Sequence, residues 1–360
     1  VECTFTNTEL GSLTIEKQTL PNGSPQSFSF SGAINTSLTD GGQAGLGGIL
    51  PGTYTVTEAA LAGWDLTDIS CTGDDDSSGD IGTRTATFNI AAGDDVSCVF
   101  TNTQRANIVL QKVLPNDNGG TATQDDFLAY IDGGPVNWDA PNEVLPNVQY
   151  TASEDTLTGY TPSAWSGDCA ADGTVTPAPG QTVTCSITND DIAPTLTLVK
   201  TVINNNGGSL AVSDFPLFIN GTPAISGTAY SQTANVQLTA SETTQAGYAP
   251  SAWGGDCAAD GTITLLPGDT KTCTITNDDV APTLTLVKTV VNDDGGDLTQ
   301  ADFPSFIDGS PVAWDTPTAV TANEVHTASE TEQNGYLAST WGSDCAADGT
   351  ITLLPGDAKT

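Results

Sequence analysis

The sequence is poor in positive charge and in histidine, and it contains no methionine. Its 360 residues include 8 Lys plus Arg against 44 Asp plus Glu, which gives a formal net charge of −36. Such an acidic surface repels nucleic acid and anionic membranes, so we expect neither as a partner. The chain has no run of about 18 apolar residues, so we expect no membrane span.

Patterns typical of targeting and of catalysis are also absent. There is no charged and then apolar start, and the missing first methionine is typical of a mature or excised piece of a longer chain. The only histidine, His326, stands where two other repeats have Leu238 and Tyr150, so we expect no catalytic role for it and no enzyme activity. Eight cysteines without a Cys-X-X-Cys motif predict disulfides in an oxidising compartment and argue against zinc.

Glycine and β-branched residues are abundant, whereas charged residues make up only 14% of the chain. A composition rich in turn formers and in threonine and valine favours an all-β fold over a helical or disordered chain.

An internal repeat decides the predicted architecture. Lys112, Lys200 and Lys288 lie 88 residues apart, and glutamates, tryptophans and cysteines follow in the same register. A more divergent copy precedes these three. We therefore expect β-sandwich repeats at 9–104, 105–191, 192–279 and 280–360, the last without its final strand, and residues 1–8 as the final strand of a preceding or neighbouring domain.

Each repeat has the pattern of a small immunoglobulin-like sandwich. About seven short strands with turn clusters between them fit into one repeat. The junctions between repeats are short, and Pro194 and Pro282 stiffen two of them. This pattern predicts an elongated rod of β-sandwiches.

Alternation along the strands places polar residues in the predicted core. In the repeat at 192–279, Lys200 shares a face with Leu198, and Asn277 shares a face with Ile275. Glu242 follows the same rule on its own strand. An unpaired buried charge costs several kcal/mol, so these groups must be paired, neutralised or reacted.

The first-strand LTLVK, the segment LTASETTQAGY at 238–248 and the last-strand CTITN resemble Cna protein B-type, or prealbumin-like (SpaA-like), repeat domains of bacterial surface adhesins and pilins. The resemblance covers essentially the whole chain. It implies that the lysine amine attacks the asparagine amide, that ammonia leaves, and that a protonated glutamate assists. The implied isopeptide sets are Lys17–Asn102 with Glu58, Lys112–Asn189 with Glu154, and Lys200–Asn277 with Glu242.

Two alternatives remain for these sets: an unreacted hydrogen-bonded triad, and chance placement. Asparagine before two aspartates is also ordinary turn chemistry, and lysine with glutamate is an ordinary ion pair.

The cysteine pair in each repeat departs from the family and offers another way to hold the last strand. The pairs expected within repeats are Cys71–Cys98, Cys169–Cys185 and Cys257–Cys273. Buried free thiols are the alternative.

Some residues are left over from these sets, and together they would supply one further cysteine pair and one further Lys–Asn–Glu set. They are Cys3, Asn7, Lys288, Glu330 and Cys345. Either the chain is a window cut from a longer tandem array, or residues 1–8 of one molecule complete the last repeat of another, head-to-tail, by strand addition. The partners are then copies of the chain or adjacent repeats of the same polypeptide.

Acidic, glycine-containing loops recur at 116–120, 204–208 and 292–296, each followed by Asp-Phe. No cofactor is expected, except that Ca²⁺ could bind there through oxygen ligands. The candidate ligands are Asp117, Asp126, Asp293 and Asp302. The alternative is a hairpin turn without metal.

Two tryptophans, Trp138 and Trp314, occupy the position of Ser226 in the intervening repeat. A core position would tolerate that exchange poorly, so we expect both indoles at a surface, in contact with an adjacent domain, another chain or a ligand. The alternative is a partly covered surface aromatic.

We therefore predict a bacterial extracellular structural protein, the stalk of an adhesin or the body of a surface fibre. A calcium-stiffened adhesive module for a glycan or protein ligand is the alternative.

Overall fold

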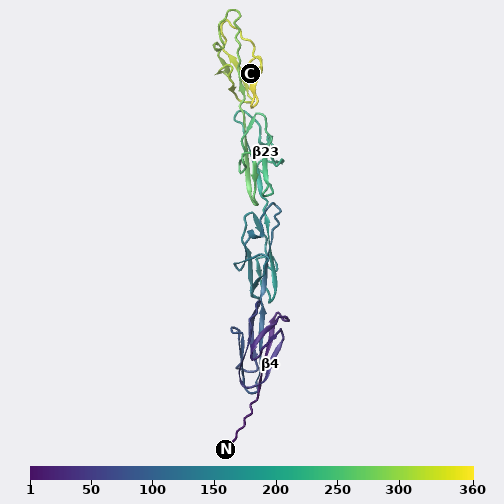
Figure 1. Cartoon of the computed structure of the whole chain (residues 1–360). Helices are drawn as coiled ribbons and strands as arrows, with labels where there is room; N and C mark the ends of the chain where they lie inside the picture. Colours follow the sequence, from purple (N-terminus) through teal and green to yellow (C-terminus); the bar gives the residue numbers. More distant parts are fainter. The chain divides into compact units, whose positions relative to one another are not determined.

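The structure is a computed structural model that describes residues 1–360 (Figure 1). Contacts divide the chain into two compact units, Val1–Pro115 with Ala122–Asp190, and Asn116–Thr121 with Asp191–Thr360. Apart from the short 3₁₀ helices η1 (Gln124–Asp126), η2 (Val212–Asp214) and η3 (Gln300–Asp302), every element is a strand, which confirms the all-β prediction. None of the helices has the length and apolar character needed to cross a membrane.

The first repeat is a sandwich of two sheets, with strand orders β4-β1-β9-β6 and β3-β2-β5-β8-β7. Its strands are β1 (Gly11–Leu20), β2 (Phe28–Gly32), β3 (Thr36–Leu38), β4 (Gln43–Ile49), β5 (Gly52–Glu58), β6 (Trp64–Thr72), β7 (Ser78–Asp80), β8 (Thr85–Ile90) and β9 (Asp95–Gln104).

The second repeat has sheets β13-β10-β18-β15, with β16 also on β18, and β12-β11-β14-β17. The bounds are β10 (Ala106–Val113), β11 (Ala129–Ile131), β12 (Gly134–Val136), β13 (Asn142–Val144), β14 (Tyr150–Glu154), β15 (Tyr160–Pro162), β16 (Ser166–Gly167), β17 (Thr174–Val175) and β18 (Thr182–Asp191).

The third repeat has the same arrangement, β22-β19-β27-β24 with β25 on β27, and β21-β20-β23-β26. The bounds are β19 (Thr195–Ile203), β20 (Leu217–Ile219), β21 (Thr222–Ala224), β22 (Ala229–Ser231), β23 (Gln237–Glu242), β24 (Tyr248–Pro250), β25 (Gly254–Gly255), β26 (Thr262–Thr264) and β27 (Thr270–Asp279).

The fourth repeat keeps one full sheet, β30-β29-β32-β33, whereas its other sheet is reduced to β31-β28-β34. The bounds are β28 (Thr283–Leu284), β29 (Ser305–Ile307), β30 (Ser310–Val312), β31 (Thr318–Ala319), β32 (Val325–Glu330), β33 (Thr350–Thr352) and β34 (Ala358–Lys359). Its first strand is two residues long, against nine in β19 of the third repeat.

First and last strands of each complete repeat lie side by side and parallel, as β1 with β9, β10 with β18, and β19 with β27. Side chains on these strands alternate between core and surface. On β27, Cys273, Ile275 and Asn277 are all buried, as the alternation predicts. The last strand therefore presents an amide to the core that its neighbouring first strand shares.

Three disulfides join the last strand of each complete repeat to a preceding segment. They are Cys71–Cys98, Cys169–Cys185 and Cys257–Cys273, the pairs expected from the sequence. Cys3 and Cys345 are free thiols, the first exposed and the second buried.

Trp138 and Trp314 are partly covered aromatics, the alternative to an open surface position. Both are half-buried and pack on the core clusters of their repeats. Their indole N–H groups donate to the carbonyls of Phe127 and Phe303, each at 2.7 Å. In the third repeat Ser226 fills the position differently, because its hydroxyl accepts the backbone N–H of Lys200 at 2.9 Å.

The Cys257–Cys273 bond should stabilise the third repeat chiefly by restricting its unfolded chain. We expect the double substitution Cys257→Ala with Cys273→Ala to lower the free energy of unfolding of this repeat by about 3 kcal/mol. Calorimetry of the full chain measures the change, and Cys345→Ala is the control, since it removes a buried cysteine without breaking a bond. Equal effects of the two changes would contradict the assignment.

Candidate cross-linking site

In the first repeat, three polar side chains from three strands meet in the core. Lys17 lies on β1, Glu58 ends β5 and Asn102 lies on β9. Their exposed fractions are 0%, 1% and 0%. The three residues come from both sheets of the sandwich, so folding of the repeat is what assembles them.

The amide of Asn102 bridges the other two groups. The Lys17 ammonium donates to Asn102 Oδ1 at 3.0 Å, and Asn102 Nδ2 donates to Glu58 Oε1 at 2.7 Å. Two carbonyls, of Gln18 and Phe100, also accept from Lys17 Nζ, at 2.8 and 2.9 Å. This amine is held beside the amide that it would attack, and the carboxyl beside the nitrogen that would leave.

Burial moves both titratable groups of this triad toward their neutral forms. Desolvation lowers the pKa of Lys17 to about 8, although the charge of Glu58 opposes that shift. Desolvation also raises the pKa of Glu58 against the opposing charges of Lys17 and Arg84. A neutral amine beside a neutral carboxylic acid is the pair that an attack on an amide requires.

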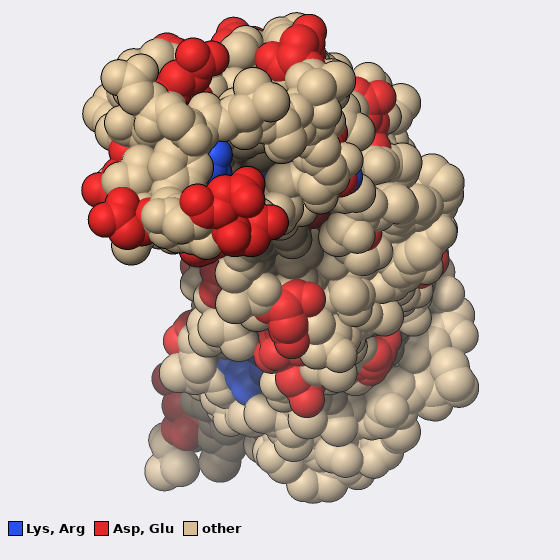
Figure 2. Space-filling view, turned by 90° about the horizontal axis from the view of Figure 1, so that it is seen from above, with Lys and Arg blue, Asp and Glu red and all other residues tan.

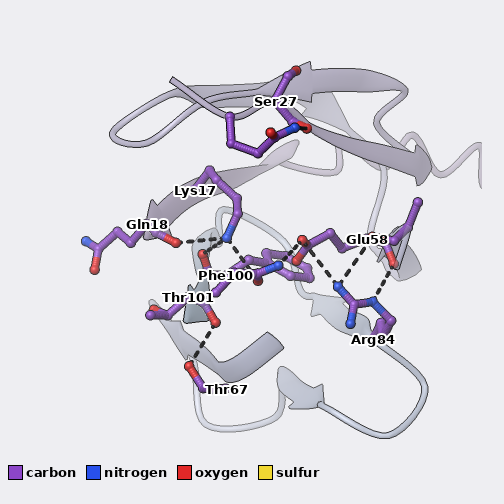
Figure 3. Close-up of polar contacts among 11 residues, drawn as sticks. Lys17, Gln18, Ser27, Glu58, Thr67, Arg84, Phe100 and Thr101 are labelled. Atoms are coloured by element: carbon purple, nitrogen blue, oxygen red, sulfur yellow. Dashed lines mark hydrogen bonds and ion pairs between the residues drawn. The ribbon is translucent and has the colours of Figure 1, made fainter. Parts of the chain in front are cut away.

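Arg84 is a member of this site that the sequence did not indicate. Its guanidinium lies 3.4 Å from Glu58 Oε1, and its Nε donates to the Glu58 carbonyl at 3.1 Å (Figure 3). No equivalent arginine exists in the later repeats, because the sequence has only two arginines, Arg84 and Arg105.

The second and third repeats bring the lysine and glutamate into direct contact. Lys112 pairs with Glu154, and Lys200 Nζ lies 2.5 Å from Glu242 Oε2. Both lysine side chains are fully buried. Desolvation lowers the pKa of each lysine, and the hydrogen bond to the glutamate opposes it.

The last-strand asparagines of these repeats have buried side-chain amides without hydrogen bonds. Neither amide atom of Asn189 or of Asn277 has a partner. In the parallel ladder Asn277 pairs with Val202, two residues beyond Lys200. An unsatisfied buried amide costs roughly 1–3 kcal/mol per group, so its presence beside the ion pair calls for a chemical reason.

The fourth repeat has the ion pair, but residues 280–360 include no asparagine equivalent to Asn277. Lys288 Nζ lies 2.7 Å from Glu330 Oε1, and their side chains are 17% and 12% exposed. A cavity of about 600 Å³ opens beside them, lined also by Phe303 and Tyr336. Basic side chains are visible at few points of the face shown in Figure 2, among many acidic ones.

Two of the other leftover residues, Cys3 and Asn7, are not brought to this pair within the chain. Residues 1–8, with Cys3 and Asn7, are exposed and belong to no strand. Cys345 lines a second cavity of about 550 Å³ together with Lys288, Glu330 and Thr360.

The four aspartates considered for calcium serve other local contacts or stand exposed. Asp126 and Asp302 accept the backbone N–H of Thr123 and Thr299, both at 2.7 Å, and these bonds lower the pKa of each carboxyl. Asp117 accepts from the side chain of Asn118 at 2.7 Å, and Asp293 is exposed. Calcium at these loops stays a prediction.

The sequence patterns did not indicate two buried aspartates, Asp191 and Asp279, as structural residues. Each follows the last-strand asparagine by two residues, and each carboxylate binds the loop after its first strand. Continuing the alternation by one more step, from Asn277 to Asp279, would have indicated them.

Several solved structures are similar to the chain at low identity. The TIE protein of Bacillus anthracis is 17% identical with a TM-score of 0.34, and the match covers 75% of this chain and 51% of that one. The pilus adhesin SpaC of Lactobacillus rhamnosus GG is 14% identical with a TM-score of 0.26, over 76% of this chain and 43% of that one. Two B repeat units of the collagen-binding protein of Staphylococcus aureus are 13% identical with a TM-score of 0.19, over 92% of this chain and 95% of that one. The chain thus spans about half of the length of the first two. No curated protein sequence matches it.

The sequence itself matches two families, both described as a prealbumin-like fold domain. Residues 13–104 match the first, and residues 103–187, 191–275 and 279–360 match the second. Together these matches cover nearly the whole chain, and they confirm the resemblance drawn from the LTLVK and CTITN strands. The chain belongs to the SpaA family of prealbumin-like domains and carries several of these domains in tandem.

Proposed function

We propose that the chain is an extracellular structural element, the stalk of an adhesin or part of a surface fibre, whose repeats are closed by Lys–Asn isopeptide bonds as well as by disulfides. The observation that carries this proposal is the buried Lys17–Asn102–Glu58 triad, with the amine 3.0 Å from the amide oxygen. The disulfides support an extracellular location.

The proposed reaction needs no external reagent. The neutral Lys17 amine attacks Asn102 Cγ and forms a C–N bond, while the bond from Cγ to Nδ2 breaks. Glu58 gives its proton to Nδ2, which leaves as ammonia, and takes a proton back from Lys17 Nζ. The 2.7 Å bond from Nδ2 to Glu58 Oε1 supports this role as proton carrier.

The same chemistry gives a reason for the unpaired amides in the second and third repeats. Once Asn277 is bonded to Lys200, the amine is no longer an ammonium that must be held in an apolar core. The new amide also joins β19 to β27 covalently. Since these strands are the first and the last of the repeat, tension cannot separate them without breaking a covalent bond.

Intact mass tests the bonds directly. We expect the full chain to weigh less than its sequence by one ammonia for each complete repeat, in addition to the hydrogens lost in disulfides. Lys200→Ala should restore one ammonia, whereas Lys271→Ala, which changes a lysine outside the triads, should restore none. A mass equal to that of the unmodified chain, after correction for disulfides, excludes the bonds.

The pH dependence of stability tests the state of Lys17. In an Asn102→Ala variant the bond cannot form, so Lys17 keeps its amine, with a pKa of about 8 when folded and 10.5 when unfolded. Between these values the unfolded chain binds more protons, so the free energy of unfolding of the first repeat should rise with pH.

Wild-type protein should lack this rise, since an amide nitrogen does not titrate. Adding Lys17→Met to the Asn102→Ala variant should abolish the rise as well. Denaturant unfolding at several pH values measures it. The same rise in wild type and variant would mean that Lys17 is unreacted in both.

We further propose that the fourth repeat accepts a last strand from another copy of the chain, head-to-tail. Its ion pair is partly exposed beside a cavity, and Cys345 is free. Residues 1–8 carry Cys3 and Asn7 with the same spacing as Cys273 and Asn277. Asn7 would bond to Lys288 with loss of ammonia, and Cys3 would join Cys345 by exchange with a small-molecule disulfide.

Concentrated protein should then form a ladder of bands on a denaturing gel under reducing conditions, because amide bonds resist reductant. Asn7→Ala should remove the ladder, whereas Thr8→Ala, in the same segment, should keep it. A single monomer band for the wild-type chain at every concentration would rule out this assembly, and would leave the bonds within repeats untouched.

A further inference from the structure

The loops at 116–120 and 204–208 are held by hydrogen bonds to the buried aspartates at the ends of β18 and β27. Asp191 accepts the backbone N–H groups of Asn118 and Gly120, at 3.0 and 2.6 Å. Asp279 accepts those of Asn206 and Gly208, also at 3.0 and 2.6 Å. In both cases the asparagine side chain donates to the carbonyl of the aspartate, at 2.9 and 2.7 Å.

The opposite side of each loop contacts a Thr-Ala-Asn turn of the following repeat. Ala234 N–H donates to the Asn118 carbonyl, and Ala322 N–H donates to the Asn206 carbonyl, both at 2.8 Å. The second carbonyl of each loop accepts from an asparagine side chain. These bonds are Asn235 Nδ2 to Gly119 O, at 2.8 Å, and Asn323 Nδ2 to Gly207 O, at 2.7 Å.

Glycine is required at the centre of this contact. Gly207 has φ +89°, and a Cβ there would lie 2.3 Å from the carbonyl oxygen of Ala322. For Gly119, with φ +90°, the oxygen of Ala234 would be at 2.5 Å. Asn235 and Asn323 have φ 60° and 59°, a left-handed conformation that asparagine tolerates better than most residues.

The fourth repeat has the same loop without the contact. Gly295 has φ +87°, but a Cβ there would have nothing within 4 Å. The junction between the first and second repeats is built differently, with Arg105 paired to Asp65 and Glu143, each at 2.9 Å. The loop contact occurs at the two junctions where a Thr-Ala-Asn turn of a following repeat is present.

We propose that the Asn-X-X-Gly-Gly loop is a docking site whose ligand is the Thr-Ala-Asn turn of the next prealbumin-like repeat. The docking couples the stability of the third and fourth repeats through direct hydrogen bonds to the carbonyls of Asn206 and Gly207, so it needs no metal ion as a bridge. None of these residues belongs to a triad, so the docking can hold whether or not the isopeptide bonds form.

Hydrogen–deuterium exchange of the full chain tests the docking at the Ala322 amide. Gly207→Ala should speed exchange of a peptide that contains Ala322 by about tenfold, through loss of two hydrogen bonds between the repeats. Gly295→Ala is the matched control. It places the same strain in the same kind of loop with no neighbour, and should leave exchange at Ala322 unchanged.

A second variant separates docking from damage to the loop itself. Asn323→Gly keeps the left-handed turn and removes only the side-chain bond to Gly207, so it should speed exchange at Ala322 severalfold. Exchange there should be the same in calcium and in chelator. Unchanged exchange in both Gly207→Ala and Asn323→Gly would overturn the docking, and protection that appears only with calcium would overturn its independence from metal.

Discussion

The burial of a lysine by the last strand is the constraint on which each repeat depends. A lysine in an apolar core must be paired with a carboxylate, lose its charge or react, or the sandwich loses several kcal/mol. In the second and third repeats the lysine side chains are fully buried under complete last strands, whereas Lys288 in the fourth repeat is 17% exposed. Register, strand length and disulfide position all serve to keep that strand in place.

Much of this arrangement could be read from the sequence, because strands have a period of two and the repeats share one register. The face of Asn277 follows from that of Cys273 by counting along β27, and the cysteine pairs follow from their recurrence. These are local rules, and they hold wherever a strand stays regular. The predicted Lys–Asn–Glu triads rest on the same rules.

What the sequence did not reveal depends on contacts between distant segments. Asp279 looked like part of a turn, yet it binds Gly208, which is 71 residues away in the chain. Trp138 looked like a surface residue because Ser226 replaces it, but its position depends on the Phe127 carbonyl, which no residue identity encodes. The exchange of tryptophan for serine between repeats shows that either side chain can be accommodated at this position. It does not show whether the position is buried or exposed.

The third repeat carries both halves of the docking pair, the loop at 204–208 and the turn at 233–235. A repeat of this kind can dock onto another copy of itself, because it carries both the loop and the turn. Gene duplication or recombination can add or remove whole copies of it, and every new junction already has its complementary surfaces. The length of such an array can therefore change over evolution in steps of one repeat, without any new interface having to arise.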